Sequence, residues 1–466
     1  MQNINSADEY GLIRTHQLSS GLIQRTDMTN ADRLIKEYGD KIRYNFAWKK
    51  WIVWNEKYWQ VDDNDAQVNA FVKEMVRGIY HDALNTSDYK ERIEIEKFAM
   101  QSESVRRVHA CIELAGKHPE ILITSDELDK NPWLLNVKNG TFDFEHDTFR
   151  EHRKEDYITK IVPVDFDINA ACPLWENFIR EIMNYDGELI QFLQTAAGYG
   201  ITGSGKEQVI FILFGSGANG KSTFLNAIMK ILGDYATSTA TETFMKQQGD
   251  RISNDIARLR GTRIVTTSET EQGRRLSEGL IKDITGNDKM TARFLYGEYF
   301  NFYPTFKIFM ATNHKPNIKG TDNGIWRRIR LIPFTTTIEA DKQDKDLEQK
   351  LVSEQSGILN WLLQGTLRWF KEGLKPPQII TNATNEYRGE MDIIGNFLKE
   401  CCVQNENGQI RIRELFKTYQ NWCNDNNEHA CSERFFGLRL KEIGYKQMRT
   451  SEARHWVGIV LRPTPP

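Results

Sequence analysis

The residues best suited to chemistry form one short loop, FGSGANGKST, which runs from Phe214 to Thr223. The loop fits the pattern GxxxxGK[ST], in which glycines let successive backbone amides curl around a phosphate group. The lysine of this pattern reaches the β- and γ-phosphates of a nucleotide, and the hydroxyl after it is a ligand for Mg²⁺. We therefore predict a site for ATP and Mg²⁺. Its predicted residues are Gly215, Gly217, Asn219, Gly220, Lys221, Ser222 and Thr223, with Ser222 as a metal ligand.

The sequence on either side of the loop supports this prediction. The run VIFILFG, which ends at Gly215, is short and continuously apolar, as is typical of a parallel strand covered on both faces. FLNAIMKIL follows the loop and carries apolar residues at helical spacing. Strand, glycine loop and helix are the context that the motif requires, whereas a chance match would need no such flanks.

Acidic side chains at a neighbouring strand end are the next requirement, because they hold Mg²⁺ and polarise water. A second buried strand, RIVTTSE, ends at Glu269, and Glu271 follows two residues later. We predict that Glu269 acts on the attacking water and the metal, and that Glu271 supports it. The two residues can exchange these parts, and an exposed loop with two glutamates is the alternative.

Three further residues complete the predicted catalytic set. A third apolar strand, FKIFMATN, ends at Asn313, whose amide is suited to hold the attacking water or to sense the γ-phosphate. Arg327 and Arg328 follow in DNGIWRRIRLIPF, directly before another apolar strand. Arginine binds transition-state charge through paired hydrogen bonds, and a neighbouring subunit often supplies it. One arginine is the candidate for this role, and a surface ion pair is the alternative for the other.

Composition limits the class of protein. A chain of 466 residues is long enough for two to four domains. Lys and Arg together number 61 against 64 acids, so a nucleic-acid surface requires local clustering of charge. The six cysteines are scattered without a CxxC pair, which favours reduced thiols and a cytoplasmic location. No segment approaches the roughly 20 apolar residues that span a bilayer, so we predict no membrane association.

The pattern of apolar residues predicts an α/β fold in several parts. We expect a flexible arm over residues 1–26, an α/β accessory region over 27–190, a motor with a parallel sheet and flanking helices over 191–375, and a C-terminal domain over 392–466. In the accessory region, the run IRYNFAWKKWIVWNEKYWQVDD predicts short strands joined by a turn at Asn55 and Glu56. Its aromatic residues can stack bases, although a packed sheet face is the commoner explanation.

The C-terminal domain is locally basic. Residues 411–462 hold ten Lys or Arg and six acids, and their pattern of three helices and a hairpin predicts a winged helix. SERFFGLRLKEIGYKQMR is the expected recognition helix, with Arg434, Arg439 and Lys441 on one side as DNA contacts. A structural cap or a protein-docking domain is the alternative.

Four blocks of sequence together carry a family resemblance. They are GSGANGKST, RIVTTSETEQGRRL, IKDITGNDKMTARFLYGEYFNFYPTF and FKIFMATNHKPNIKGTDNGIWRRIRLIPF. In this order they resemble the superfamily 3 helicases, in particular the branch of phage, plasmid and poxvirus primase-helicases. The resemblance covers about residues 136–388. It implies an AAA+ type ATPase that forms a ring, usually a hexamer, around DNA and moves 3′ to 5′ on one strand.

The resemblance also assigns roles to residues. It places Lys221 and Ser222 at the nucleotide, Glu269 at the acidic strand end, Asn313 at the sensor, and Arg327 or Arg328 at the neighbouring subunit's site. Residues 282–306 resemble a block whose hairpin projects into the channel of the ring. The residues expected to contact single-stranded and forked DNA there are Lys289, Arg293 and Tyr296, near a tip at Gly297.

We therefore predict an ATP-dependent DNA helicase that works at a replication origin or fork of a phage, plasmid or other mobile element. The main alternative is an initiator or loader that binds origin duplex DNA and uses ATP to control assembly, and a DNA translocase is a third. Two acid pairs, Asp62 with Asp63 and Asp165 with Asp167, lie in turn-like surroundings. Primer synthesis is therefore not expected of this chain, and a separate primase or polymerase is a candidate partner.

Overall fold

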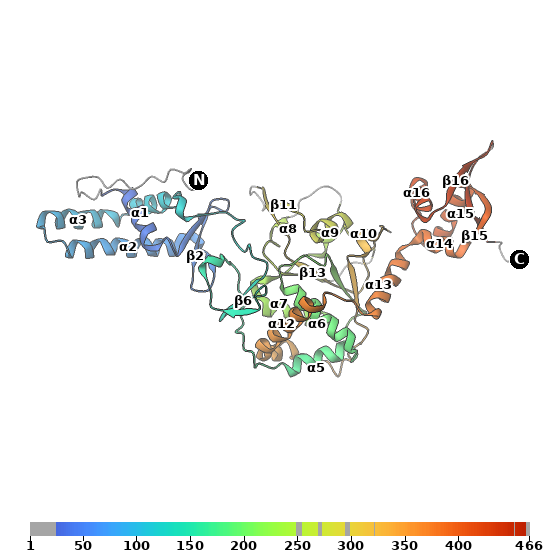
Figure 1. The fold of residues 1–466 in the computed structure, drawn as a ribbon, viewed down its shortest axis with the longest axis horizontal. Helices are drawn as coiled ribbons and strands as arrows, with labels where there is room; N and C mark the ends of the chain where they lie inside the picture. Colours follow the sequence, from blue (N-terminus) through green and yellow to red (C-terminus); the bar gives the residue numbers. More distant parts are fainter. Residues whose placement is uncertain are drawn as a thin grey trace, which may run out of the picture. The chain divides into compact units, whose positions relative to one another are not determined.

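The computed structural model describes residues 25–247, 254–268, 273–293, 299–320, 322–451 and 453–462. They form two compact units, of which the first holds the residues up to 128 together with 157–159, and the second holds the remainder (Figure 1). Residues 129–156 and 160–190, which we assigned to the accessory region, thus pack with the second unit. Among the described residues, no helix has both the length and the apolar character needed to cross a membrane.

The first unit packs helices on a four-stranded sheet of order β3-β2-β1-β4. Its elements are α1 (Asp27–Tyr38), β1 (Ile42–Asn45), β2 (Lys50–Trp54), β3 (Trp59–Val61), α2 (Ala66–Leu84), α3 (Tyr89–Ser102), α4 (Val105–Ala115) and β4 (Leu122–Ile123). The predicted turn is confirmed, since Asn55 Oδ1 accepts hydrogen bonds from the amides of Lys57 and Tyr58. Trp51 and Trp59 are 2% and 1% exposed, so these two aromatic side chains serve the core.

A five-stranded parallel sheet of order β14-β8-β13-β10-β9 forms the centre of the second unit. Its strands are β8 (Ile210–Phe214), β9 (Ala236–Ser238), β10 (Ile264–Ser268), β13 (Lys307–Thr312) and β14 (Ile329–Pro333). The three apolar runs that predicted buried strands are confirmed as β8, β10 and β13. All six residues of β13 are buried, as expected of a strand covered on both faces.

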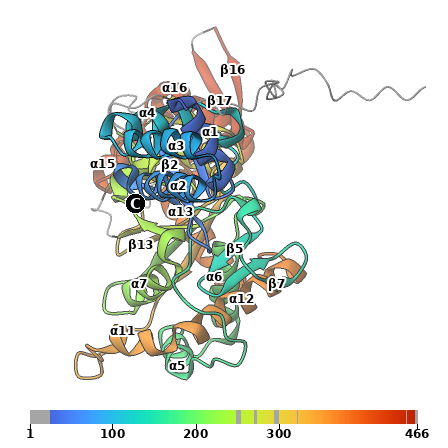
Figure 2. The same ribbon diagram turned by 90° about the vertical axis from the view of Figure 1, so that its left-hand side faces the viewer.

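Alternate side chains of β8 enter two different cores. Phe211 and Leu213 join a cluster formed with the helices α5 (Pro173–Ile182), α6 (Gly187–Ile201), α7 (Lys221–Leu232) and α12 (Gln355–Glu372). Ile210 and Ile212 join the opposite cluster, to which α8 (Asn254–Ala257), α9 (Glu278–Thr285), α10 (Asn323–Trp326) and α13 (Gln378–Met391) contribute. Figure 1 shows these two groups of helices on the two faces of the sheet, and Figure 2 shows α5, α6 and α12 from the side. The sheet is therefore held rigidly between two apolar layers.

The second unit also contains two hairpins that lie outside the five-stranded sheet. The first has its turn near His146, where Asp143 Oδ1 accepts hydrogen bonds from the amides of Glu145 and His146. This turn joins the last two strands of a small sheet made of β5 (Leu134–Val137), β6 (Gly140–Asp143) and β7 (Thr148–Arg150). The second hairpin pairs β11 (Met290–Arg293) with β12 (Tyr299–Phe302) in antiparallel fashion.

The C-terminal part combines three helices with a three-stranded antiparallel sheet of order β15-β17-β16. Its elements are α14 (Ile393–Cys401), β15 (Cys402–Arg411), α15 (Ile412–Asp425), α16 (Glu433–Ile443), β16 (Lys446–Arg449) and β17 (Arg454–Leu461). The sequence predicts the helices and the final hairpin but not β15. The segment CVQNENGQIR is mostly polar and shows no alternation of apolar and polar residues. In the structure, Cys402, Gly408 and Ile410 are the buried residues of this strand.

Candidate nucleotide site and nucleic-acid surfaces

The phosphate loop joins β8 to α7 through two glycines in the left-handed region. Gly217 has φ 106° and Gly220 has φ 80°. A Cβ atom on Gly220 would lie 2.4 Å from Ile182 Cγ2, and one on Gly215 would lie 2.2 Å from Phe334 O. Residues with side chains are thus excluded at Gly215 and Gly220 by space, and at Gly220 also by backbone conformation. The motif spacing reflects the tight path of this loop.

Lys221 is the first residue of α7 and is only 6% exposed. Its Nζ donates hydrogen bonds to Gly215 O at 2.8 Å, Asn219 Oδ1 at 2.9 Å and Asn313 Oδ1 at 3.1 Å. Asn219 Nδ2 in turn donates to Phe334 O at 3.2 Å. The loop is therefore tied to the residues that follow β13 and β14. These hydrogen bonds hold the lysine in place, which limits the reorganisation needed to bind an anion.

A cavity of about 430 Å³ opens in front of this lysine. Its lining residues are Gly217, Ala218, Asn219, Gly220, Lys221, Ser222, Thr223, Ala311, Thr312 and Asn313. The N-cap residue of α7 is Gly220, which has no side chain to cap the first turn, so the backbone amides and the positive end of the helix dipole there are directed to the cavity. The hydroxyl of Ser222 belongs to an exposed residue of the same turn. These features fit the phosphates of a nucleotide with its Mg²⁺.

The strand register brings the predicted strand ends to one edge. Thr312 of β13 pairs with Phe214 of β8, and Ser268 of β10 pairs with Ala311 of β13. Asn313 is therefore next to the phosphate loop, as its hydrogen bond to Lys221 also shows. Glu269 and Glu271 lie outside the described residues, directly after the end of β10, so their roles stay a prediction.

The two adjacent arginines differ in their surroundings. Arg328 is 8% exposed, and its guanidinium donates to Thr285 Oγ1 at 2.8 Å and to Gly324 O at 2.5 Å. Burial lowers the pKa of Arg328 from its usual value. Arg327 is exposed at the end of α10. Arg328 thus stabilises the contact between α9 and α10, whereas Arg327 is exposed.

The β11–β12 hairpin has an apolar and a polar face. Ala292 and Phe302 are buried in the core, whereas Lys289 and Arg293 are exposed. The guanidinium Cζ of Arg293 lies 4.9 Å from the ring centroid of Tyr299, its partner across the two strands. Tyr299 is 57% exposed. The predicted contact Tyr296 and the tip at Gly297 lie outside the described residues.

Tyr299 is a candidate that sequence reasoning missed. In β-strands alternate residues share a face, and cross-strand partners share it too. The register that places Tyr299 opposite Arg293 follows from the length of the turn, which the sequence alone does not fix.

The predicted contact face of α16 needs one correction. Arg434 and Lys441 are seven positions apart and share a side of the helix, but Arg439 is turned well away from Arg434. Arg439 donates to Asp392 Oδ2 at 3.4 Å and to Glu442 Oε2 at 3.2 Å. It therefore joins α16 to the start of α14 and does not belong to the same surface.

The acid pairs that we weighed for primer synthesis have local roles. Asp62 is 3% exposed, and its carboxylate accepts hydrogen bonds from the amides of Gln67 and Val68 at the start of α2. Asp165 pairs with Lys138 at 2.9 Å. Within the described ranges, no group of three or more His, Cys, Asp and Glu side chains is arranged to hold a metal ion.

Three family profiles match successive parts of the chain. A D5 N-terminal-like domain matches residues 31–184, a family of unknown function matches 213–328, and a poxvirus D5 protein-like family matches 389–456. Among solved structures, the C-terminal region of NrS-1 is 10% identical, with a TM-score of 0.48 over 93% of this chain and 100% of that one.

Curated relatives come from large DNA viruses. A putative helicase of Acanthamoeba polyphaga mimivirus is 29% identical over 330 residues, which are 65% of this chain and 34% of the relative. A putative helicase of Frog virus 3 is 24% identical over 82% of this chain and 47% of the relative. A putative primase of African swine fever virus is 24% identical over 64% and 34%. The chain spans between about a third and a half of the length of these relatives. With D5-type domains towards both ends and putative helicases and primases of large DNA viruses as relatives, the chain shows the predicted resemblance to the primase-helicase branch of superfamily 3.

Proposed function

We propose that the chain is an ATP-dependent DNA helicase of replication, with an AAA+ type motor that acts as a ring at an origin or fork. The observation that carries this proposal is the hydrogen bond from Lys221 Nζ to Asn313 Oδ1, beside a cavity that the start of α7 also lines. It joins the phosphate loop to the neighbouring strand end, where a γ-phosphate sensor is required. Relatives described as putative helicases support the same conclusion.

In this proposal the residues of the site divide the tasks of phosphoryl transfer between them. Lys221 contacts the β- and γ-phosphates, and Asn313 orients the attacking water or reports the γ-phosphate. Ser222 and Glu269 would hold Mg²⁺, which supplies charge neutralisation at the phosphates when it is bound. Glu269 is also the proposed acceptor of the proton from the attacking water. Little covalent chemistry is needed, so position and charge account for most of the rate.

Arg327 supplies the last positive charge from the neighbouring subunit of the ring. Its exposure supports this role, since the adjacent Arg328 is held inside its own subunit. Mixed rings provide the test. Subunits with Glu269→Gln have an intact arginine, and subunits with Arg327→Ala have an intact acid, so mixing them should restore part of the turnover at shared interfaces. No restoration at any ratio would contradict action between subunits.

The β11–β12 hairpin is the proposed contact with the translocating strand. The exposed Tyr299 and Arg293 combine an aromatic face with a cation, and single-stranded nucleic acid is bound by such pairs without sequence preference. Movement of the hairpin as subunits repack around ATP would then pull one strand, in the proposed 3′ to 5′ direction.

Strand displacement on forked DNA tests this contact. Loss of one stacking partner costs ~1–3 kcal/mol per base, so we expect Tyr299→Ala to lower displacement about tenfold or more. Tyr89→Ala is a matched control, because Tyr89 is 75% exposed on α3 of the first unit. Equal displacement by the two variants would remove the hairpin from the mechanism. Substrates with only a 3′ or only a 5′ tail test the direction.

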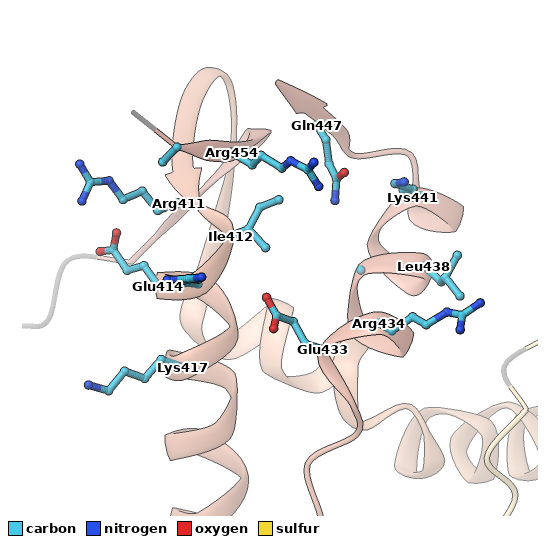
Figure 3. A pocket seen from close by; sticks show the side chains of 13 residues that line it. Arg411, Ile412, Glu414, Lys417, Glu433, Arg434, Leu438, Lys441, Gln447 and Arg454 are labelled. Carbon is cyan, nitrogen blue, oxygen red and sulfur yellow. The ribbon is translucent and has the colours of Figure 1, made fainter. Parts of the chain in front are cut away.

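An initiator or loader is the second candidate, because the exposed basic side chains of Arg434, Lys441 and Arg454 in the C-terminal part (Figure 3) can bind DNA without hydrolysis. ATP turnover that DNA does not stimulate, with no displacement on any tailed substrate, would favour that function.

A further inference from the structure

We propose that Lys315 is a positioning residue for ATP hydrolysis, which holds Asn313 at the nucleotide cavity by fastening the turn after β13 to the end of α13. The inference rests on the proposed function, since it concerns the same site. The residues that line the cavity include Asn313 but not Lys315. Lys315 therefore lies behind the site and acts through another residue.

The turn that carries Asn313 is braced within itself. Thr312, the last residue of β13, is 1% exposed. Its Oγ1 donates a hydrogen bond to His314 O at 2.6 Å and accepts one from the amide of His314 at 3.0 Å. These two bonds fix the backbone on either side of Asn313. A contact that holds this turn therefore also sets the place of Asn313 Oδ1, which accepts a hydrogen bond from Lys221.

Lys315 joins this turn to α13 through an ion pair. Its Nζ lies 2.8 Å from each carboxylate oxygen of Glu390, near the end of that helix. The side chain of Lys315 is 18% exposed and that of Glu390 is 52% exposed. An ion pair that is half open to solvent contributes little to the stability of a fold. Its geometry directs two of the three N–H donors of the lysine to one carboxylate, which limits the positions that the turn can take.

Two aromatic rings also contact the ammonium group. Lys315 Nζ lies 5.0 Å from the ring centroid of Phe214 and 5.6 Å from that of Tyr387. A cation at such distances is attracted to the face of an aromatic ring. Phe214 is the last residue of β8 and directly precedes Gly215 of the phosphate loop. Lys315 thus connects the start of the phosphate loop, the turn after β13 and α13.

Tyr387 of α13 holds the turn at a second point. It is fully buried, and its hydroxyl donates a hydrogen bond to Pro316 O. Burial raises the pKa of Tyr387, so the hydroxyl keeps the proton that it donates. Its ring meets the ring of Trp326 edge-on, with the two centroids 5.2 Å apart. Because Trp326 directly precedes Arg327, α13 supports both the turn with Asn313 and the helix that ends at the proposed arginine.

The helix α13 is a firm support for these contacts. Ile380 belongs to the apolar core on one face of the sheet and Tyr387 to the core on the other face. Both side chains are fully buried. Thr384 Oγ1 accepts a hydrogen bond from the amide of Leu331 in β14 at 3.2 Å. A helix that is anchored in both cores and to the sheet holds Glu390 in a defined place.

Steady-state ATP hydrolysis by the full chain is the first test. We expect Lys315→Ala to lower kcat about tenfold or more, because a displaced catalytic group slows a reaction strongly. KM should change by about threefold or less, since the phosphate loop is intact. Glu390→Gln should lower kcat in the same direction. The double variant should be no slower than Lys315→Ala alone, because the two residues act as one unit.

Calorimetric titration adds a measurement that does not require hydrolysis. A nonhydrolysable ATP analogue carries the γ-phosphate that Asn313 is proposed to sense, whereas ADP does not. We expect Lys315→Ala to reduce the ratio of analogue affinity to ADP affinity at least threefold, roughly the loss of one displaced contact, while ADP affinity itself stays the same.

Two variants serve as controls. Lys117→Ala breaks a Lys117–Glu113 ion pair of 2.7 Å on α4 in the first unit, so it removes the same kind of contact away from the site and should leave kcat unchanged. Lys315→Arg keeps the charge and can pair with the same carboxylate, so it should restore kcat to within about threefold of the unmodified chain. The melting temperatures of all these proteins should be nearly equal, because exposed ion pairs add little stability.

Three results would overturn the inference. The first is a Lys315→Ala protein with the kcat and the affinity ratio of the unmodified chain. The second is an equal loss of kcat in Lys117→Ala. The third is full additivity of the losses in Lys315→Ala and Glu390→Gln, which would show that the two residues do not act as a pair. An unmodified chain that binds neither nucleotide would instead contradict the nucleotide site of the proposed function, and the inference would fall with it.

Discussion

The phosphate loop and the C-terminal cleft both contain cations, but they are built in opposite ways. Lys221 is 6% exposed and donates hydrogen bonds to Gly215, Asn219 and Asn313. The C-terminal cleft lies between α15, α16 and the β16–β17 hairpin (Figure 3), and it is lined by six exposed basic residues: Arg411, Arg413, Lys417, Arg434, Lys441 and Arg454. The loop has the geometry for one nucleotide held in one pose, and the cleft has the geometry for a polymer held in many.

The burial of the cation distinguishes two kinds of phosphate-binding site. A buried, prearranged cation strengthens its interaction with a transition state and discriminates between close ligands. Exposed cations are screened and hydrated, so their effect depends on number and on release of counterions from a polyanion. We therefore expect ATP hydrolysis at the loop and DNA binding without a reaction at the cleft.

The largest expected effect concerns Arg327, the residue that we propose completes the nucleotide site of a neighbouring subunit. Removal of an arginine that stabilises transferring phosphate costs ~10³-fold or more in turnover. We expect Arg327→Ala to show such a loss in steady-state ATP hydrolysis with nucleotide affinity nearly unchanged. Arg328→Ala instead should lower the melting temperature, because Thr285 Oγ1 and Gly324 O lose their partner. The reverse pattern would exchange the two roles.

A single methyl group in the loop should have the next largest effect. Gly220 has φ 80°, and its Cβ would lie 2.4 Å from Ile182 Cγ2. We expect Gly220→Ala to weaken ATP binding at least ~100-fold, because the strain and the clash displace the amides that contact phosphate. Calorimetric titration with a nonhydrolysable ATP analogue measures this. Duplex binding at the cleft should stay unchanged, and parallel losses in both would mean global misfolding.

The salt dependence of binding should also differ between the two sites, although this effect is smaller than that of the substitutions in the loop. Between about 50 and 200 mM salt, binding through several phosphates loses a large factor, whereas a buried site is screened much less. We expect duplex affinity of the Lys221→Ala protein to fall at least tenfold over this range. ATP affinity of the unmodified chain should change about threefold or less. Equal salt dependence of the two affinities would end the distinction drawn between them.

The smallest expected effect shows that burial of a lysine alone does not make a site. Lys307 is 3% exposed, and its Nζ donates to the backbone carbonyls of Thr202, Ser204 and Thr305. Burial, and then the neighbouring Arg263, hold the pKa of Lys307 well below that of an ordinary lysine. The unfolded chain therefore keeps this proton to higher pH than the folded chain does. The free energy of unfolding should rise with pH between the two pKa values, by up to ~1.4 kcal/mol per pH unit.

Urea denaturation between about pH 7 and pH 10 measures this slope. Lys307→Met removes the titrating group, so the variant should lose its share of the rise while ATP affinity stays the same. Identical slopes in the two proteins would show that Lys307 is protonated equally in both states.

The parts of the site that the sequence predicted are those encoded in contiguous residues. The loop, its strand and its helix follow from one motif, and Asn313 follows from the end of an apolar run. Arg327 and Arg328 could not be separated, because only the packing of α9 against α10 decides which of them is buried. The same holds for β15, whose pairing with β17 gives a polar segment its strand conformation.

The cleft shows more clearly what cannot be predicted from the sequence. Arg413, Lys417 and Arg454 belong to two elements about forty residues apart, and the sequence shows only that this part of the chain is basic. Arg439 was placed on the wrong side of α16, since its spacing of five residues from Arg434 turns it away and towards Asp392.

ATP turnover and displacement of a forked DNA strand, measured together on the unmodified chain and on Lys221→Ala, decide whether the chain is a helicase. We expect turnover that DNA stimulates, displacement that requires ATP, and loss of both in the variant while duplex binding at the cleft persists. Turnover without displacement on any tailed substrate would contradict the helicase and leave an initiator or loader. Displacement that survives in Lys221→Ala would contradict the assignment of the phosphate loop itself.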